Sequence, residues 1–339
     1  MLPDGELPRD LFAIRAEPLD EQGVAALLRD TASDQPFGQL SGEGELRLSI
    51  AGAQEKTALL RHQGKWQRPI GSTPTTHILK LPMGLVGAMR ADMRTSIENE
   101  WLCSRIVAAF GLPVAQCDIA RFDGMKALVV ERIDRRVSAD GRWIVRLPQE
   151  DMCQATGTSP VHKYQADGGP GISRIMEILL GAEHAHEDRV RFFKTQVLFW
   201  LLAAPDGHAK NFSIFHLPGS QYRATPLYDI LSAHPIVGTG AHRIAPQRLK
   251  LAMAVRGSQN YYLMSQIRRR HWLQHAGLVG LGHDLADAII RDILDQVSDV
   301  IARVQSDIPG GFPEDVAQSI FQGMTMHANQ LERMADARR

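Results

Sequence analysis

Short runs of alternating apolar and polar residues dominate the front of the chain, and they predict β-strands. Four such runs follow one another between residues 46 and 80. Two more are joined by Asp123-Gly124, a pair typical of a two-residue hairpin turn. Between the two groups, Ile97 and Trp101 begin an apolar stripe with helical spacing. The predicted strands are Leu46–Ile50, Lys56–Arg61, Trp66–Ile70, Thr76–Lys80, Val114–Phe122 and Met125–Ile133, and the predicted helices are Glu21–Leu28 and Ser96–Phe110.

Beyond Pro148 the apolar residues recur mostly at three- and four-residue intervals, which is the spacing of amphipathic helices. This pattern predicts helices at 149–156, 173–182, 187–203, 259–276, 285–305 and 314–335. A hairpin is predicted among them at Ser213–Phe215 and Gln221–Ala224. A sheet-rich front followed by a helix-rich back predicts an α+β protein with two lobes. We divide it into an N-terminal lobe, residues 1–133, and a helical C-terminal lobe, residues 134–339.

The composition is that of a globular protein, and it excludes several classes of function. The 339 residues are 44% apolar, and 38 basic residues balance 38 acidic ones. A chain-wide basic surface for nucleic acid is therefore excluded, although a local patch is not. The longest bulky apolar run, Val197–Ala204, is too short to span a bilayer, and the N-terminus lacks the apolar stretch of a signal peptide. Three cysteines without a C-x-x-C pair argue against a zinc site or a disulfide framework, so we expect a cytoplasmic protein without a membrane partner.

The first candidate for a catalytic site is the segment Asp206–Asn211, which follows the apolar run Val197–Ala204. An aspartate followed five positions later by an asparagine is the spacing of the catalytic loop of kinases. In that loop the carboxylate accepts the proton of the substrate hydroxyl, and the amide oxygen holds a magnesium ion. The alternative is a helix end with a turn at Asp206 and with Asn211 as a cap. Taken alone, the alternative is favoured, because the spacing is common by chance.

Asp229 follows the predicted hairpin, which is where kinases place their main magnesium ligand. The residues around it are Leu, Tyr, Ile and Leu, and the Phe-Gly that follows this aspartate in kinases is absent. The alternative is a solvated or capping acid. Because an acid with such apolar neighbours is unusual on a plain surface, we favour the metal-ligand interpretation.

Two upstream features gain weight from their order along the chain. Lys80 ends an apolar strand and precedes a helix that bears acids, as the phosphate-binding lysine of kinases does. Residues 51–56 form a loop of mostly small and polar residues whose backbone N–H groups suit phosphates. Taken singly, a solvent-exposed lysine is favoured over a phosphate ligand, and the loop alone is a weak signal. The order of loop, lysine, base, amide and acid is far less probable by chance than any one of them.

Two further clusters are expected to be structural. His271 and His275 lie four positions apart on a predicted helix without the remainder of a zinc motif, so surface or capping positions are favoured. The basic cluster Arg268–Arg270 is expected to be a solvated helix face rather than a contact for DNA or for an acidic partner.

Nine short stretches between residues 49 and 257 carry a family resemblance. They are SIAGAQEKTALL (49–60), THILKLP (76–82), ENEWLC (98–103), ALVVERIDRR (127–136), RLPQEDMCQATG (146–157), KYQADGGPGI (163–172), DGHAKNFSIF (206–215), TPLYDILSA (225–233) and KLAMAVRG (250–257). Together they resemble the HipA family of bacterial serine/threonine kinase toxins. The resemblance implies a bilobal protein-kinase-like fold that uses ATP and Mg²⁺ and transfers the γ-phosphate to serine.

The resemblance also assigns roles to single residues. Asp206 resembles the catalytic base, and Asn211 and Asp229 resemble the magnesium ligands. Ser49, otherwise an ordinary strand serine, resembles the serine that the family autophosphorylates. The residues expected around the nucleotide are Ala51, Gly52, Ala53, Gln54, Glu55 and Lys56 of the phosphate loop, Lys80, the hinge residues Glu131, Arg132 and Ile133, and His208, Lys210, Asn211, Tyr228 and Asp229.

The front of the chain departs from the family pattern. Members typically carry a further small N-terminal subdomain, whereas 48 residues precede Ser49 here. The chain therefore resembles the short HipT-like form, in which a separate small protein supplies the missing piece. That form carries two serines in the loop. Here Ala51 occupies the position of the second serine, so Ser49 is the one serine of this pair that could be autophosphorylated.

The resemblance implies three kinds of partner. They are a helix-turn-helix antitoxin, DNA reached only through that antitoxin, and an aminoacyl-tRNA synthetase as the protein substrate, whose phosphorylation halts translation. The alternative function is that of a catalytically silent kinase fold acting as antitoxin partner and transcriptional corepressor. Because base, amide and acid are all present, we favour an active ATP-dependent serine/threonine kinase.

Overall fold

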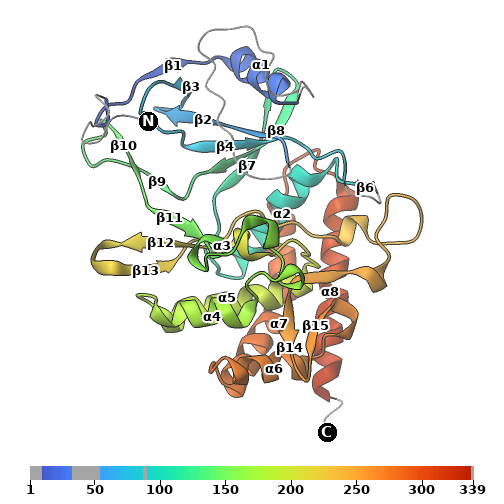
Figure 1. The fold of residues 1–339 in the computed structure, drawn as a ribbon. Coiled ribbons are helices and arrows are strands. Elements are labelled where there is room, and N and C mark those ends of the chain that lie inside the picture. Colours follow the sequence, from blue (N-terminus) through green and yellow to red (C-terminus); the bar gives the residue numbers. More distant parts are fainter. Residues whose placement is uncertain (1–9, 33–53, 87–89, 337–339) are drawn as a thin grey trace. The chain divides into compact units, whose positions relative to one another are not determined.

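The computed structural model describes residues 10–32, 54–86 and 90–336 (Figure 1). Its internal contacts divide the chain into two compact units. The first comprises Met1–Gly84 and Ala115–Leu147, and the second comprises Leu85–Val114 and Pro148–Arg339. A sheet-rich unit and a helix-rich unit confirm the predicted α+β class. The sequence-based division at residue 133 stays a prediction, and it differs from these units chiefly in the placement of Leu85–Val114.

A six-stranded antiparallel sheet forms the centre of the first unit, in the order β1-β3-β2-β4-β8-β7. Its strands are β1 (Ala16–Pro18), β2 (Lys56–His62), β3 (Lys65–Pro69), β4 (His77–Lys80), β7 (Cys117–Phe122) and β8 (Met125–Glu131). Helix α1 (Glu21–Ala32) contributes Val24 and Leu28 to one apolar core with Leu59 and Leu79 of the sheet. A separate hairpin consists of β9 (Arg135–Val137) and β10 (Ile144–Arg146).

The turn between β7 and β8 follows from its two residues. Asp123 and Gly124 have φ values of 44° and 80°, which an Asp-Gly pair adopts at little cost in a hairpin turn. Phe122 and Met125 are cross-strand partners on either side of the turn. Arg29 of α1 donates a hydrogen bond of 2.6 Å to the Asp123 carboxylate. The predicted hairpin is confirmed, and the turn is tied to the helix.

Helices make up most of the second unit (Figure 1). They are α2 (Ser96–Ala109), α3 (Met152–Ala155), α4 (Ile172–Ile178), α5 (Ala185–Leu201), α6 (Arg269–Leu278), α7 (His283–Ser306) and α8 (Glu314–Asp336). The short strands are β5 (Leu85–Val86), β6 (Ala91–Asp92), β11 (Gln149–Asp151), β12 (Ser213–Leu217), β13 (Gln221–Ala224), β14 (Lys250–Arg256) and β15 (Asn260–Leu263).

Helix α5 leads into the candidate site. Its side chains are buried on several faces, including Phe193 and Trp200, which is expected of a helix surrounded by other elements. The indole N–H of Trp200 donates to the backbone oxygen of Met264 at 3.1 Å, so its one polar atom is satisfied. The C-terminal end of α5 is therefore held firmly at the point where the chain enters the segment containing Asp206.

Most of the predicted helices are confirmed, and two predictions are wrong in part. The prediction 149–156 is wrong at its start, because Gln149–Asp151 pairs with β12 as a strand and α3 begins at Met152. The predictions 187–203, 285–305 and 314–335 correspond closely to α5, α7 and α8. The prediction 259–276 is wrong at its start, because Asn260–Leu263 pairs with β14 as a strand and α6 begins only at Arg269. The predicted strand Leu46–Ile50 lies outside the described residues. Within the described ranges, no helix combines the length and the apolar character needed to cross a membrane.

Candidate active site

The candidate catalytic loop begins where α5 ends. Ala203 has a φ of 48°, which is uncommon for a non-glycine residue and turns the chain sharply. Inside the loop, the His208 amide donates to the Asp206 backbone oxygen at 2.8 Å, and the Asn211 amide donates to the His208 oxygen at 2.9 Å. These local hydrogen bonds wind the segment into one tight turn. The two ends of the D-x-x-x-x-N motif therefore lie together.

Two aromatic side chains contact the Asp206 carboxylate. The Tyr164 hydroxyl donates a hydrogen bond to Asp206 Oδ1, and His208 Nε2 lies 3.6 Å from the same oxygen. The rings of Tyr164 and His208 meet edge to face, with centroids 5.1 Å apart. The Asp206 side chain nevertheless remains 47% exposed. A hydroxyl group arriving from solvent can therefore still reach the carboxylate.

Burial sets the protonation of both aromatic side chains. Burial, followed by the charge and hydrogen bond of Asp206, raises the pKa of Tyr164, so its hydroxyl stays protonated. Burial also lowers the pKa of His208, although the charge of Asp206 acts in the opposite direction, so the imidazole is neutral at pH 7. The charge of Asp229 also helps to raise the pKa of Tyr164, and it opposes the lowering of the His208 pKa.

Asn211 is buried in the loop with a defined orientation. Its Nδ2 donates to the backbone oxygen of Asp206 at 2.8 Å. Because a carbonyl oxygen can only accept, this hydrogen bond fixes which end of the amide faces Asp206. The amide oxygen Oδ1 is the end of the side chain that could bind a cation, and the metal-binding role of Asn211 stays a prediction.

Asp229 adopts a left-handed backbone with a φ of 61°, a conformation that Asn and Asp tolerate best among residues other than glycine. The neighbouring Tyr228 hydroxyl donates to the backbone oxygen of Lys210 at 3.1 Å and also bonds Ser213 Oγ. Tyr228 therefore ties the segment that carries Asp229 to the end of the catalytic loop. Its predicted contact with the nucleotide stays a prediction.

Asn99 of α2 holds the segment after Asp229, although nothing in the sequence predicted it. Its Nδ2 donates to the Ser232 backbone oxygen at 2.7 Å, and its Oδ1 accepts from the Ser232 amide at 2.8 Å. The side chain is 2% exposed. Ser232 Oγ in turn donates to the Leu202 oxygen at 2.6 Å, just before the catalytic loop. Asn99 and Ser232 thus connect the Asp229 segment with the end of α5.

Helix α8 supports the same segment. His234 Nε2 donates to the Leu201 oxygen at 2.9 Å, and His327 Nδ1 donates to the Trp200 oxygen at 2.8 Å. The two imidazole rings lie 5.1 Å apart. A Cβ at position 323 would collide with the His234 ring, so α8 can approach this closely only because Gly323 lacks a side chain. Burial lowers the pKa of both histidines, to about 4 for His234, so both act as neutral packing groups.

Lys210 is held by an acid that was not predicted. Its ammonium group lies 2.6 Å from Asp151 Oδ2. Asp151 also caps α3, because its Oδ1 accepts from the Cys153 and Gln154 amides at 2.9 and 3.0 Å. The ion pair anchors the catalytic loop to the start of α3. The expected contact of Lys210 with the nucleotide stays a prediction.

The described residues that are expected to bind phosphate lie at one end of β2 and β4. Lys56 and Lys80 are cross-strand partners in that ladder. Gln54 Nε2 donates to the Leu81 oxygen at 2.6 Å, and the Leu81 amide donates to the Glu55 oxygen at 3.0 Å. The described end of the expected phosphate loop therefore lies beside the expected phosphate-binding lysine. Ser49, Ala51, Gly52 and Ala53 lie outside the described residues.

The expected hinge residues Glu131, Arg132 and Ile133 lie at the end of β8. The Arg132 guanidinium donates to both carboxylate oxygens of Asp134, at 3.0 and 2.9 Å, and Arg135 donates to Oδ2 at 2.6 Å. Burial alone would raise the pKa of Asp134, but the hydrogen bond of Arg132 and the charges of both arginines outweigh it and lower the pKa. This ion-pair cluster fixes the segment. The contact with adenine stays a prediction.

The chemistry of the second unit's side chains fits a magnesium ion. Mg²⁺ prefers oxygen ligands and is typically held by one or two protein groups together with phosphates. Asn211 offers an oriented amide oxygen, and Asp229 offers a carboxylate. His208 Nδ1 is buried without a hydrogen-bond partner among the residues described. A bound polar ligand would satisfy such an atom.

His271 and His275 are both buried, so the surface interpretation is wrong. His275 Nδ1 accepts from the Arg256 amide at 3.0 Å, and its Nε2 bonds Ser173 Oγ at 2.9 Å. His271 Nδ1 accepts from the Arg268 amide at 3.2 Å. This bond lies at the start of α6, so His271 has the helix-capping role that was the second of the two expected positions. Burial lowers the pKa of both rings, to about 4 for His275. The two histidines are neutral structural groups.

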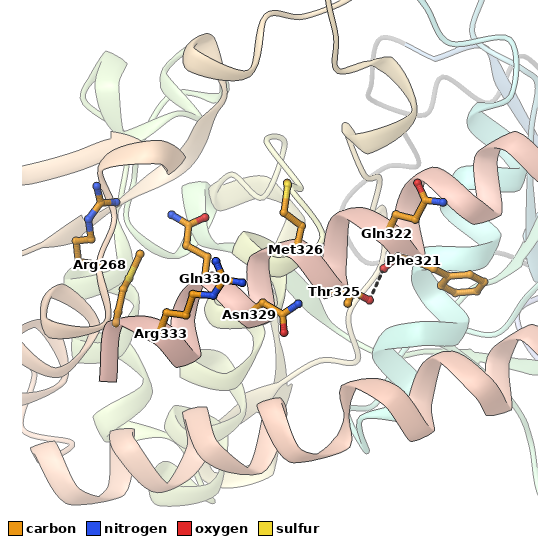
Figure 2. Close-up of a pocket in the computed structure, with 9 residues that line it drawn as sticks. Arg268, Phe321, Gln322, Thr325, Met326, Asn329, Gln330 and Arg333 are labelled. Carbon is orange, nitrogen blue, oxygen red and sulfur yellow. Dashed lines mark hydrogen bonds between the residues drawn. The ribbon is translucent and has the colours of Figure 1, made fainter. Parts of the chain in front are cut away.

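A surface groove of about 880 Å³ runs along α8 (Figure 2). It is lined by residues of α8 between Phe321 and Met334 and by Arg268. None of the predicted site residues lines it. The groove is therefore separate from the candidate active site.

Comparisons with known proteins agree with the resemblance. The family model described as "HipA-like C-terminal domain" matches residues 48–301. The protein "Putative kinase Y4mE" of Sinorhizobium fredii is 33% identical over 312 residues, which cover 91% of this chain and 69% of the relative. The "Serine/threonine-protein kinase toxin HipA" of Shewanella oneidensis is 31% identical over 205 residues, which cover 56% of this chain and 44% of that protein. The matched region is therefore less than half of the HipA relative.

Two solved structures share the fold. A complex of Shewanella oneidensis HipA with HipB and operator DNA matches with a TM-score of 0.75 and 24% identity, over 99% of this chain and 75% of that chain. The Helicobacter pylori proinflammatory kinase CtkA matches with a TM-score of 0.52 and 11% identity, over 87% of this chain and 95% of that chain. At these identities the likeness concerns the fold alone, and it agrees with the expected kinase-like architecture.

Proposed function

Because the chain belongs to the family defined by the HipA-like C-terminal domain, we propose that it is an ATP-dependent serine/threonine kinase and the toxin of a toxin–antitoxin system. One observation carries the proposal. The accessible carboxylate of Asp206 and the oriented amide of Asn211 lie together in the second unit, and Tyr228 ties the segment that carries Asp229 to the same loop. Base, amide and acid form the set of groups that phosphoryl transfer requires.

In this proposal Asp206 is the catalytic base. Its carboxylate accepts the proton of a serine hydroxyl while the serine oxygen bonds to the γ-phosphorus, and the bond to the bridging oxygen of ATP breaks to release ADP. Asn211 and Asp229 hold Mg²⁺, which neutralises phosphate charge when bound. Lys80 binds the phosphates as a point charge. The remaining nucleotide contacts come from residues 51–56, from the hinge 131–133 and from His208, Lys210 and Tyr228.

Transfer of labelled phosphate from γ-labelled ATP to the proteins of a bacterial lysate tests this function. We expect the wild type to form labelled phosphoserine. In Asp206→Asn the rate of its formation should fall by about 10²- to 10⁴-fold, which is the usual contribution of general base catalysis. Asp292→Asn is the matched control, since this exposed acid forms an ion pair with Lys194 on the same unit and is not one of the predicted site residues. A folded wild type that binds ATP but transfers no phosphate would contradict the proposal and favour the silent corepressor.

We propose that the phosphorylated protein is an aminoacyl-tRNA synthetase and that a helix-turn-helix antitoxin binds this chain and supplies the DNA contact. The solved HipA relative, which was determined with HipB and operator DNA, supports the second point. Identification of the labelled lysate protein by mass spectrometry tests the first. A separate small protein of the HipT-like systems is a further expected partner, and co-expression of such a protein with this chain tests it.

Gly207→Ala should impair both the fold and the reaction. A Cβ at this position would collide with the ring of Phe199, which is buried and cannot move freely. We expect a loss of about 1–3 kcal/mol in stability. Because the neighbouring Asp206 would shift, the transfer rate should also fall by about 10²-fold. In Gly310→Ala the new Cβ meets open space, and equal melting temperatures and rates for the two variants would refute the expectation.

Ser49 should become phosphorylated when the wild type is incubated with ATP, and it should remain unmodified in Asp206→Asn. The phosphate adds about −1.5 to −2 charge and three acceptor oxygens. These oxygens would compete with ATP for the N–H groups of the adjoining loop, so the modified protein should bind ATP more weakly. Mass spectrometry measures the modification and calorimetry the affinity. Equal ATP affinity of both forms would rule out this switch.

A further inference from the structure

Tyr164 lies in the connection between α3 and α4, which is wound tightly around it. Its backbone oxygen accepts from the amides of Asp167 and Gly169 at 3.1 and 3.0 Å. A Cβ at position 169 would collide with backbone oxygens of the same turn, so only glycine fits there. The neighbouring Lys163 oxygen accepts from the Ala209 amide at 3.2 Å. The backbone around Tyr164 is therefore fixed and is joined directly to the catalytic loop.

The Tyr164 side chain is fixed as well. Its ring meets the His208 ring edge to face, and the Lys163 ammonium lies 5.3 Å from the ring centroid. Its hydroxyl donates to Asp206 Oδ1, a contact between residues 42 positions apart. This hydrogen bond occupies one oxygen of the carboxylate. Among the described residues no hydrogen bond to the other oxygen, Oδ2, is found, so Oδ2 is open to an incoming hydroxyl.

Two roles would fit a hydroxyl group that is hydrogen-bonded to the catalytic base. Tyr164 could occupy the place of the substrate hydroxyl and block the site, or it could orient the carboxylate for the substrate. A blocking residue would cover the carboxylate, whereas the Asp206 side chain remains 47% exposed. Tyr164 and His208 also approach the same oxygen, rather than one oxygen each. The geometry favours orientation.

We propose that Tyr164 is a positioning residue that holds the Asp206 carboxylate so that Oδ2 faces the serine hydroxyl. This inference rests on the proposed function, because it takes Asp206 as the base. Without the hydrogen bond, the carboxylate can rotate about its side-chain torsions among several orientations. Only some of these leave an oxygen aligned with the hydroxyl, and loss of alignment lowers the rate without weakening the binding of ATP.

Tyr164→Phe tests the proposal, because it removes the hydroxyl and keeps the ring. With γ-labelled ATP and lysate proteins as the probe, the maximal rate should fall by about 10- to 10²-fold. The KM for ATP and the calorimetric affinity for ATP should stay within about twofold of wild type. Tyr222→Phe is the matched control, since that hydroxyl donates to the Ile178 oxygen on the same unit, at 2.5 Å, and does not contact Asp206. Its rate should equal that of wild type.

A double-mutant cycle separates positioning of Asp206 from a general effect on the fold. In the Asp206→Asn background, Tyr164→Phe should change the residual rate by less than about twofold. An equal loss in both backgrounds would show that Tyr164 acts elsewhere and would overturn the proposal, as would an unchanged rate in the single variant. A higher rate would show that Tyr164 blocks the base. A wild type without any phosphate transfer would instead refute the proposed function, and the inference with it.

Discussion

Asp229→Asn should remove most Mg²⁺-dependent phosphate transfer while the protein stays folded. The substitution takes away the charge that holds the metal and keeps the size of the side chain. The left-handed backbone at this position, with a φ of 61°, is tolerated by asparagine but strains most other residues, so asparagine is the least disruptive replacement. We expect the rate at saturating ATP to fall by roughly 10²- to 10³-fold, as when one group that stabilises transition-state charge is lost.

Rates measured over a range of Mg²⁺ concentrations check this expectation, together with melting temperatures. High Mg²⁺ should recover part of the lost rate, because the weakened site still retains Asn211. Asp123→Asn is the matched control. Asp123 also has a positive φ, 44°, but it lies in the β7–β8 turn of the other unit, where its ion pair with Arg29 is exposed. A folded Asp229→Asn protein with the full rate at every Mg²⁺ concentration would refute the metal-ligand role.

Asn99→Leu should cause the largest loss of stability among these variants. Leucine has a similar size, but it leaves the buried N–H and C=O of Ser232 without partners, and Cys103 Sγ, which donates to Asn99 Oδ1 at 3.3 Å, also loses its acceptor. An unpaired buried polar group costs about 1–3 kcal/mol, so we expect about 2–5 kcal/mol in total. The melting temperature should fall by about 3–7 °C.

The same variant should also slow phosphate transfer, because the segment that carries Asp229 loses its link to α2. Thermal and urea unfolding measure the stability, and initial rates well below the melting temperature measure the reaction. Asn329→Leu on the exposed surface of α8 is the control, and its stability should change little. If both variants unfolded at the same temperature, the clamp between Asn99 and Ser232 would have no energetic importance.

Local signals were sufficient to predict the main parts of the site. The Asp-Gly pair predicted the β7–β8 turn, because its two positive φ values are a property of those residue types. The spacing of Asp206 and Asn211 predicted a loop in which both lie together, because the hydrogen bonds that wind it are formed within the segment itself. These predictions were correct because the local structure depends on residues that are close together in the sequence.

Contacts between distant residues could not be predicted in this way. Tyr164 lies 42 positions from Asp206, Asp151 lies 59 from Lys210, and Asn99 lies 133 from Ser232. Asn99 stands between two glutamates on α2, a pattern that indicates a solvated face, and yet it is buried. The prediction of a helix at the position of strand β15 was wrong for a related reason. The tyrosines of this segment fit a helix or a strand, and pairing with β14 decides in favour of the strand.

Helix α8 sets a lower limit on the length of chain that can fold around this site. The match to the family model ends at residue 301, before α8 begins at Glu314. Yet α8 supplies Gly323 and His327, which contact the segment after Asp229, and it buries apolar side chains such as Ile320 and Leu331. A fragment trimmed to the matched region would expose those apolar partners to water. The region that the family model matches is therefore shorter than the unit that must fold.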